Sequence, residues 1–366
     1  MATHKTLIFH IGDHKTGSTS IQHAFARKGV ILEGRTILYP GSIAHNWLKR
    51  PLKAYSRGKK KAPAYNAAIK KFKNLAENIR ASKADFCLIS AEGIQDIKPA
   101  VFHEVVTKYF ADAADEIRVI AYVRPHGPRV MSSFAERLKI GALSVMDTGP
   151  EQILELFAEK RIFPYHARFG AWRAEFGDNF LLRPMIRSQL YNGSVVEDFV
   201  HHAFSTTDFQ LVNIDSANES LDLVDLMRLK HLQSQCRERS GDLRHALGWE
   251  FGRVVAAMPS PEVRTKLLLH KGLARKIHTA WLEDARAVDQ AFFGGAPLLE
   301  DELDAALEGA VETKQSFQPE DWLGADELRG LTVLSHIISD MAANQAVDWP
   351  THWRTKLVSV LRPQEG

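Results

Sequence analysis

The chain has 366 residues, of which 45% are hydrophobic and 25% are charged, and its formal net charge is +3. This composition is typical of a soluble globular protein, and a chain of this length can bury a sizeable core. Cys87 and Cys236 are far apart, so we expect neither a disulfide framework nor a metal site, and a reducing compartment. The apolar run at residues 6–12 is too short to span a bilayer. We therefore expect a cytoplasmic protein without a membrane span.

The first two hundred residues alternate short apolar runs with longer helical patterns. The expected strands cover residues 7–11, 36–39, 86–89, 117–123 and 179–182. The expected helices cover residues 18–27, 64–82, 99–109, 129–140, 151–159, 165–176 and 195–204. This alternation predicts an α/β fold with a parallel sheet covered on both faces. The nearly continuous hydrophobic run at residues 118–123 suits a central strand.

From about residue 213 onward, strand signals become scarce and the chain reads as helical. We expect helices at residues 220–237, 261–270, 303–314 and 326–343. The sequence therefore predicts an α/β core over residues 1–212. A helical C-terminal region over residues 213–366 would pack on this core.

The stretch between the first expected strand and the first expected helix carries the most information. It reads Gly12-Asp13-His14-Lys15-Thr16-Gly17-Ser18-Thr19-Ser20, a tight polar loop that leads into a helix. Such a loop offers backbone N–H groups and a helix N-terminus to an anion. Gly12 and Gly17 permit the turn, and Lys15 is a cation that can follow charge during group transfer. The alternative is a strand-to-helix turn with an ordinary serine cap.

This loop differs from that of the nucleoside triphosphatases, in which lysine follows the second glycine. Here Lys15 precedes Gly17 by two residues. The run Lys15-Thr16-Gly17-Ser18-Thr19 after a first strand resembles the 5′-phosphosulfate loop of the sulfotransferases. In that family the lysine commonly follows a proline, and His14 stands at this position here.

A second family signature is an arginine at the end of a strand with a serine eight residues later on the next helix. Arg124 and Ser132 have this spacing after the expected strand at 117–123. An arginine there can make a charge-assisted fork to a phosphate, and parallel α/β sheets bind ligands at this edge. The alternative is a surface arginine that closes a strand. A less specific resemblance to the family continues through residues 163–204. The resemblance as a whole covers residues 6–204, about half of the chain.

The resemblance implies a P-loop-like central sheet and a sulfotransferase activity. The donor would be 3′-phosphoadenosine 5′-phosphosulfate (PAPS), the acceptor a hydroxyl or amine, and the product adenosine 3′,5′-bisphosphate (PAP). It implies no metal, and a bacterial carbohydrate-type branch rather than the small-phenol branch. The residues that it assigns to PAPS are Lys15, Thr16, Gly17, Ser18, Thr19, Ser20, Arg124 and Ser132.

The acceptor must lose a proton, and a base near the carboxyl edge of the sheet would serve. Glu92 follows the expected strand at 86–89 and is our first candidate. His45 follows the strand at 36–39 and is the alternative. His126, next to Arg124, could contact substrate or cofactor. Each of these residues could instead be a solvated or packing side chain.

The stretch 49–73 holds ten lysines and arginines and no acid. It could capture an anionic acceptor, or it could be a solvated face. We expect the acceptor to be a small molecule, a glycan or a lipid, and expect no nucleic-acid partner. Two alternatives remain at this point: a P-loop-like small-molecule kinase, and a non-catalytic protein that binds a nucleotide or a polyanion.

Overall fold

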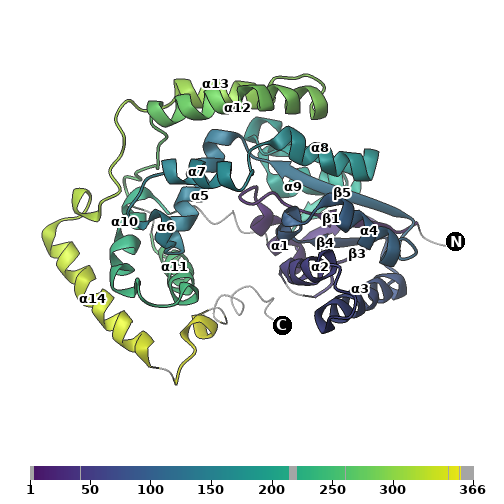
Figure 1. Ribbon diagram of the computed structural model, residues 1–366, viewed down its shortest axis with the longest axis horizontal. Helices are drawn as coiled ribbons and strands as arrows, with labels where there is room; N and C mark the ends of the chain where they lie inside the picture. Colours follow the sequence, from purple (N-terminus) through teal and green to yellow (C-terminus); the bar gives the residue numbers. More distant parts are fainter. Residues whose placement is uncertain are drawn as a thin grey trace. The chain divides into compact units, whose positions relative to one another are not determined.

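The computed structural model describes residues 4–41, 43–213, 221–259, 261–344, 346–353 and 355. Its main sheet has five parallel strands in the order β3-β4-β1-β5-β6 (Figure 1). These strands are β1 (Thr6–His10), β3 (Ile37–Leu38), β4 (Phe86–Ser90), β5 (Glu116–Val123) and β6 (Phe180–Pro184). The expected α/β fold with a parallel sheet flanked by helices is confirmed. A small antiparallel pair was not expected; it consists of β2 (Val30–Leu32) and β7 (Phe209–Leu211).

Fourteen α-helices occur within the described ranges. They are α1 (Ser18–Ala26), α2 (Lys49–Ser56), α3 (Pro63–Ala81), α4 (Pro99–Tyr109), α5 (His126–Lys139), α6 (Leu143–Met146), α7 (Glu151–Glu159), α8 (Tyr165–Phe176), α9 (Val195–Phe204), α10 (Leu223–Leu232), α11 (Gly241–Ala256), α12 (Lys271–Phe292), α13 (Leu298–Glu308) and α14 (Ala325–Ala343). None of them is both long and apolar enough to cross a bilayer.

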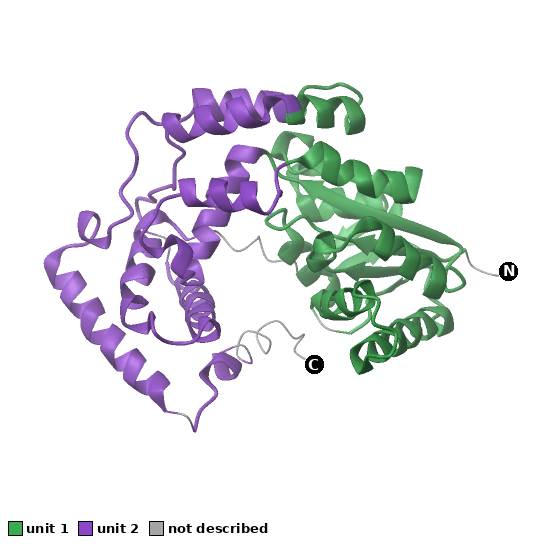
Figure 2. Ribbon diagram, in the orientation of Figure 1, with its two compact units in different colours: residues 1–125, 164–215, 284–298 green, residues 126–163, 216–283, 299–366 purple. Residues whose placement is uncertain are grey.

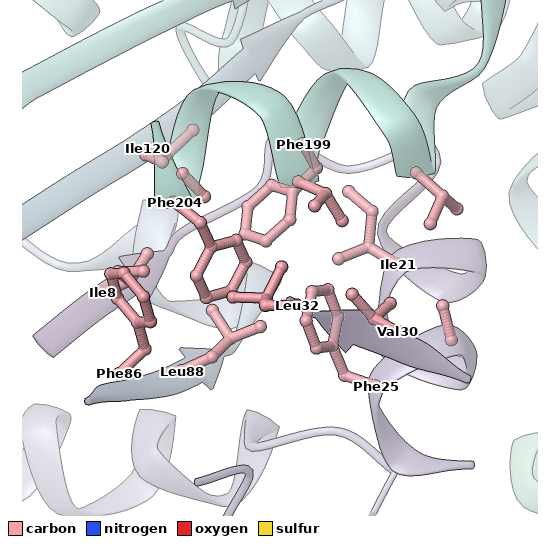
Figure 3. Close-up of a cluster of buried hydrophobic side chains, with 14 of the residues drawn as sticks. Ile8, Ile21, Phe25, Val30, Leu32, Phe86, Leu88, Ile120, Phe199 and Phe204 are labelled. Carbon is pink, nitrogen blue, oxygen red and sulfur yellow. The ribbon is translucent and has the colours of Figure 1, made fainter. Parts of the chain in front are cut away.

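The central strands are buried on both faces, which explains their continuous apolar sequences. Neighbouring side chains of a strand point to opposite faces. On one face, Ile8 of β1 belongs to a buried cluster with Phe199 and Phe204 of α9 and with side chains of α1 (Figure 3). On the other face, Phe9 packs edge-on against Phe102 of α4, with ring centroids 5.1 Å apart. The helices thus fix both faces of β1, and with them the start of the polar loop.

The strand order places a switch point between β1 and β5. After β1 the chain continues to β3 and β4 on one side, and after β5 it continues to β6 on the other. Where connections diverge in this way, open α/β sheets leave a crevice outside the carboxyl ends of the strands. The polar loop at residues 12–20 follows β1, and Arg124 follows β5. Both motifs from the sequence therefore lie at the switch point.

The chain forms two compact units (Figure 2). The first comprises residues 1–125, 164–215 and 284–298, and it contains the sheet. The second comprises residues 126–163, 216–283 and 299–366 and is helical in its described part. Each unit draws on three separated stretches, whereas the sequence suggested one division at residue 213. A division into residues 1–212 and 213–366 stays a prediction.

The C-terminal region is helical, although several of its helices differ from those expected. Helix α14 agrees with the expected 326–343, and α13 begins five residues before the expected 303. Helix α10 lies within the helix that was expected at residues 220–237. Residue 220 itself lies outside the described residues. Helices α11 and α12 were not predicted.

The helix expected at residues 261–270 was wrong. Its backbone groups pair with distant segments instead of with one another. Thr265 O accepts the N–H of Leu223 at 2.8 Å, and Leu269 O accepts the N–H of Val311 at 3.0 Å. Because these tertiary bonds satisfy the main chain, an apolar pattern alone does not impose a helix here.

Candidate functional site

The polar loop begins by extending the sheet. Beyond the end of β1, Ile11 N–H donates to Ile120 O at 3.0 Å, Tyr122 N–H to Gly12 O at 2.7 Å, and Asp13 N–H to Tyr122 O at 3.1 Å. The loop then turns away from β5 into α1. Its starting point is therefore fixed by main-chain bonds to the central strand.

Three residues of the loop have left-handed backbone conformations: Gly12 (φ 102°), Lys15 (φ 64°) and Gly17 (φ 81°). Such a conformation is uncommon for a residue with a side chain, and strained residues often occur at functional sites. A Cβ atom on Gly17 would lie 2.8 Å from Cγ1 of Val195, and one on Gly12 would lie 3.3 Å from Cα of Glu92. Both glycines are thus required by close approach as well as by backbone angle.

A buried ion pair between Asp13 of the loop and Arg168 of α8 holds the loop in place. The Asp13 side chain is 1% exposed, and its Oδ2 lies 2.6 Å from Nη2 of Arg168 on α8. Its Oδ1 accepts the backbone N–H of His14 at 2.7 Å. Removing one partner of such a pair leaves an uncompensated buried charge, which costs about 3–5 kcal/mol. The pair therefore stiffens the loop. It could not be predicted from local sequence, because Arg168 is 155 residues from Asp13.

The hydroxyl residues divide into two kinds. Thr16 and Ser18 are buried, and both donate to Asp13 O, at 2.6 and 3.4 Å. Thr19 is exposed and Ser20 half-buried. We expected all four hydroxyls to contact PAPS. Two of them, those of Thr16 and Ser18, also make hydrogen bonds within the loop.

The first turn of α1 presents its N–H groups without a side-chain cap. Its N-cap is Gly17, and no side chain within the described ranges accepts a hydrogen bond in the capping position. The positive end of the helix dipole and these N–H groups favour an anion. An ordinary serine cap, the alternative considered from the sequence, is not formed.

Arg124 joins the two motifs. Its Nη1 donates to the backbone oxygen of Lys15 at 2.9 Å, across 109 residues of sequence. Its own backbone oxygen accepts the hydroxyl of Tyr165 at 3.0 Å. The backbone N–H of Tyr165 in turn donates to Asp284 at 2.8 Å, which caps the start of α8. The arginine after β5 is therefore fixed against the loop after β1.

Ser132, the expected partner of Arg124, lies in the second unit, in the middle of α5. Its assignment to the 3′-phosphate stays a prediction. His126 begins the same helix and is fully buried. Its ring lies 4.8 Å from that of Phe163 and 5.9 Å from that of Trp281 between centroids. This is the environment of a packing histidine.

Glu92 follows β4 and opens a short 3₁₀ turn, Glu92–Asp96. Its Oε2 lies 3.3 Å from Nδ1 of His14. Burial acts to raise the pKa of Glu92, but the hydrogen bond and charge of His14, together with the charge of Lys15, outweigh it and hold the pKa below its usual value. The carboxylate therefore stays ionised at neutral pH, beside the polar loop.

His45 is engaged by the main chain through both ring nitrogens. Nε2 contacts Pro40 O at 2.5 Å, and Nδ1 accepts the N–H of Ser90 at 3.0 Å. The side chain is fully buried, and burial lowers its pKa. Main-chain groups therefore occupy both ring nitrogens, which favours Glu92 over His45, and the assignment of the base stays a prediction.

The basic stretch adjoins the turn that carries Glu92. It forms α2, a connecting loop and the start of α3. Lys49 forms an ion pair with Asp96 on that turn, and the N–H of Gly93 donates to Oδ1 of Asn46 at 3.0 Å. Nine of the ten cations are exposed: Arg50, Lys53, Arg57, Lys59, Lys60, Lys61, Lys70, Lys71 and Lys73.

No family model matches this chain, and no curated protein or solved structure matches it either. What the chain does must therefore be argued from its own residues. In the described part of the chain, no group of three or more His, Cys, Asp or Glu side chains could hold a metal ion.

The close approach of Gly17 to Val195 gives a test of the loop. Gly17→Ala should lower the free energy of unfolding by about 1–2 kcal/mol, because alanine disfavours the left-handed backbone. The contact of the new Cβ atom with Val195 should lower it by a further amount of about 1–3 kcal/mol. Gly34 is a matched control, because its φ is 67° and a Cβ there would meet nothing within 4 Å. Gly34→Ala should therefore lower the free energy of unfolding by the first amount only. Equal losses in denaturant titrations of the two variants would contradict the tight contact at Gly17.

Proposed function

We propose that this protein is a sulfotransferase with a P-loop-like core, which moves a sulfuryl group from PAPS to an acceptor hydroxyl or amine. The observation that carries the proposal is the hydrogen bond from Arg124 to Lys15 O. It joins the loop of the first motif to the arginine of the second, at the switch point of a parallel sheet. A single motif would be weak support; two that meet in space are stronger.

The proposed division of roles follows from the chemistry of each group. The uncapped start of α1 and the loop N–H groups receive the 5′-phosphosulfate. Lys15 neutralises charge on the bridging oxygen as the phosphate leaves. Arg124 receives the 3′-phosphate. The carboxylate of Glu92 is needed for removal of the proton from the acceptor. PAP is the product.

A small-molecule kinase is the main alternative, and a non-catalytic nucleotide-binding protein is the second. A kinase would hold Mg²⁺ with an acidic residue near the end of a second strand. Here Arg124 follows β5, and the two acids beside the loop already have partners: Asp13 pairs with Arg168, and Glu92, which follows β4, contacts His14. These features favour a sulfuryl donor whose phosphates are bound by cationic side chains and backbone amides over a nucleotide that is bound through Mg²⁺.

The direct test supplies PAPS labelled in its sulfate group, with panels of sugar, lipid and phenol acceptors. We expect labelled product and an equal amount of PAP. Transfer of the terminal phosphate of ATP to the same acceptors, with none from PAPS, would contradict the proposal. We further propose a cytoplasmic location, where PAPS would meet the enzyme.

The 3′-phosphate gives the next prediction. Arg124→Ala should weaken PAP binding by about 1.5–3 kcal/mol, the contribution of a charge-assisted hydrogen bond, and leave adenosine 5′-phosphate binding nearly unchanged. Calorimetric titration of both ligands measures this discrimination. Arg118→Ala is the matched control, because Arg118 lies on β5, which Arg124 follows, and pairs with Glu116 at the opposite end of that strand. Undiminished discrimination in Arg124→Ala would remove Arg124 from the site.

The basic stretch predicts an anionic acceptor. Exposed charges are screened over about 8–10 Å at moderate ionic strength, so the Michaelis constant of the acceptor should rise with salt. Replacing Lys59, Lys60 and Lys61 together by alanine should raise that constant at low salt and flatten its salt dependence. A salt-independent constant, unaffected by the triple substitution, would assign the stretch to an ordinary solvated face.

A further inference from the structure

The position before Lys15 departs from the family pattern, and the departure has a structural partner. His14 stands where proline is common, and its Nδ1 lies 3.3 Å from Oε2 of Glu92. The only nitrogen of a proline belongs to the peptide bond and carries no hydrogen, so a proline could not make this contact. The pair joins the loop after β1 to the turn after β4, two neighbouring strands of the sheet.

Both members of the pair are held in place. The backbone N–H of His14 donates to Oδ1 of Asp13 at 2.7 Å and to Oε1 of Gln95 at 3.3 Å. The main chain before Glu92 is fixed by the N–H of Ala91, which donates to His10 O at 2.8 Å. The backbone at both residues is therefore fixed by hydrogen bonds, and the fold itself brings the two side chains together.

Exposure distinguishes the two members. The His14 side chain is 40% exposed and that of Glu92 is 27% exposed. Nδ1 of His14 faces the carboxylate, while Nε2 makes no hydrogen bond within the described ranges. A carboxylate behind an imidazole fixes the Nδ1–H tautomer and stabilises the imidazolium, which leaves Nε2 as the basic atom.

We infer that His14 takes the proton of the acceptor through Nε2, with Glu92 as the carboxylate that orients its ring. This inference rests on the proposed function and refines the role of Glu92 from base to partner. As the acceptor O–S bond forms, the acceptor O–H bond breaks and its proton passes to Nε2. The bond from sulfur to the bridging oxygen breaks, and its electron pair leaves with the 5′-phosphate of PAP. The imidazolium then releases its proton to water.

Other charged groups lie around this pair. Lys15 and Asp13 belong to the same loop, Asp96 lies on the turn of Glu92, and Arg168 of α8 pairs with Asp13. His10 ends β1; burial lowers its pKa to about 4, so it remains neutral where the reaction runs. The pH dependence of the reaction should therefore not arise from His10.

The chain offers a close control. Nδ1 of His103 on α4 lies 3.5 Å from Oε2 of Glu175, with side chains 43% and 32% exposed. This pair has nearly the same geometry as His14 with Glu92, but it lies away from the loop. His103→Ala removes an equivalent histidine without touching the proposed site.

The experiment has two parts. In the first, turnover is measured as PAP release from PAPS with the best acceptor of the panel. His14→Ala should lose about 10²–10⁴-fold, the usual share of general base catalysis, and added imidazole should restore part of it. His14→Gln should be as slow and should not respond to imidazole, His103→Ala should match the wild type, and PAP affinity should change little in all three. Full activity of His14→Ala, or no rescue by imidazole, would overturn the inference.

The second part needs no turnover. Nitrogen-15 NMR of the histidine rings should show neutral His14 mainly as the Nδ1–H tautomer, and Glu92→Leu should abolish this preference. A predominant Nε2–H tautomer in the wild type would also overturn the inference. Failure of the sulfotransferase proposal looks different: the wild type would then bind no PAP, whatever the tautomer of His14.

Discussion

Lys15→Ala is expected to reduce turnover with PAPS by at least about 10²–10³-fold while the protein stays folded. The ammonium group is proposed to meet charge that develops on the bridging oxygen only as the phosphate leaves, so its loss should act on the transition state. The backbone oxygen of residue 15, which accepts from Arg124, is kept by alanine. PAP affinity should therefore fall far less than turnover.

Lys28→Ala is the control for this substitution. Lys28 has the same residue type and a similar left-handed backbone (φ 55° against 64°), but it is exposed beyond the end of α1. The two variants should have similar free energies of unfolding and very different turnover. If Lys15→Ala turns over at nearly the wild-type rate, Lys15 has no role in the chemical step.

Glu92→Gln is the second substitution with a large expected effect. It keeps the size of the side chain and removes the negative charge beside His14, so turnover should fall about 10²–10⁴-fold. PAP affinity should barely change, because Glu92 is not proposed to touch the phosphates. The pKa of Glu92 is held below its usual value, so the wild-type carboxylate remains ionised until the pH falls through that lowered pKa. The acidic limb of the pH–rate profile should move or vanish in the variant.

Glu116→Gln controls for the loss of a paired glutamate. Glu116 also has a lowered pKa and an ion pair, with Arg118, but it begins β5 at the opposite edge of the sheet. Its variant should retain turnover. Wild-type activity in Glu92→Gln would mean that removal of the acceptor proton does not depend on this carboxylate.

Much of the fold was predictable because its sheet is buried on both faces. Continuous apolar runs marked β1 and β5, and the helices between strands carried regular patterns, so the bounds of α4, α7, α8 and α9 agree with the expected ones. Parallel strands end at one edge, so the order of the motifs already predicted that the loop after β1 and Arg124 would be neighbours.

Features that depend on contacts between distant residues could not be predicted in this way. The pairs Asp13–Arg168 and His14–Glu92 join segments whose local sequences show no sign of each other. His45 has the sequence context of a base on an edge loop, yet main-chain groups occupy both of its nitrogens. The irregular segment at 261–270 follows from tertiary hydrogen bonds that its apolar pattern does not reveal.

Calorimetric titration of the wild-type protein with PAP and with ATP, each with and without Mg²⁺, tests the proposed sulfotransferase most directly. Cations and backbone amides are proposed to hold both phosphates of PAP, so PAP should bind more tightly than ATP, and Mg²⁺ should make no difference to its affinity. ATP binding that requires Mg²⁺ and exceeds PAP binding would instead favour the kinase, and binding of neither nucleotide would contradict the proposed site altogether.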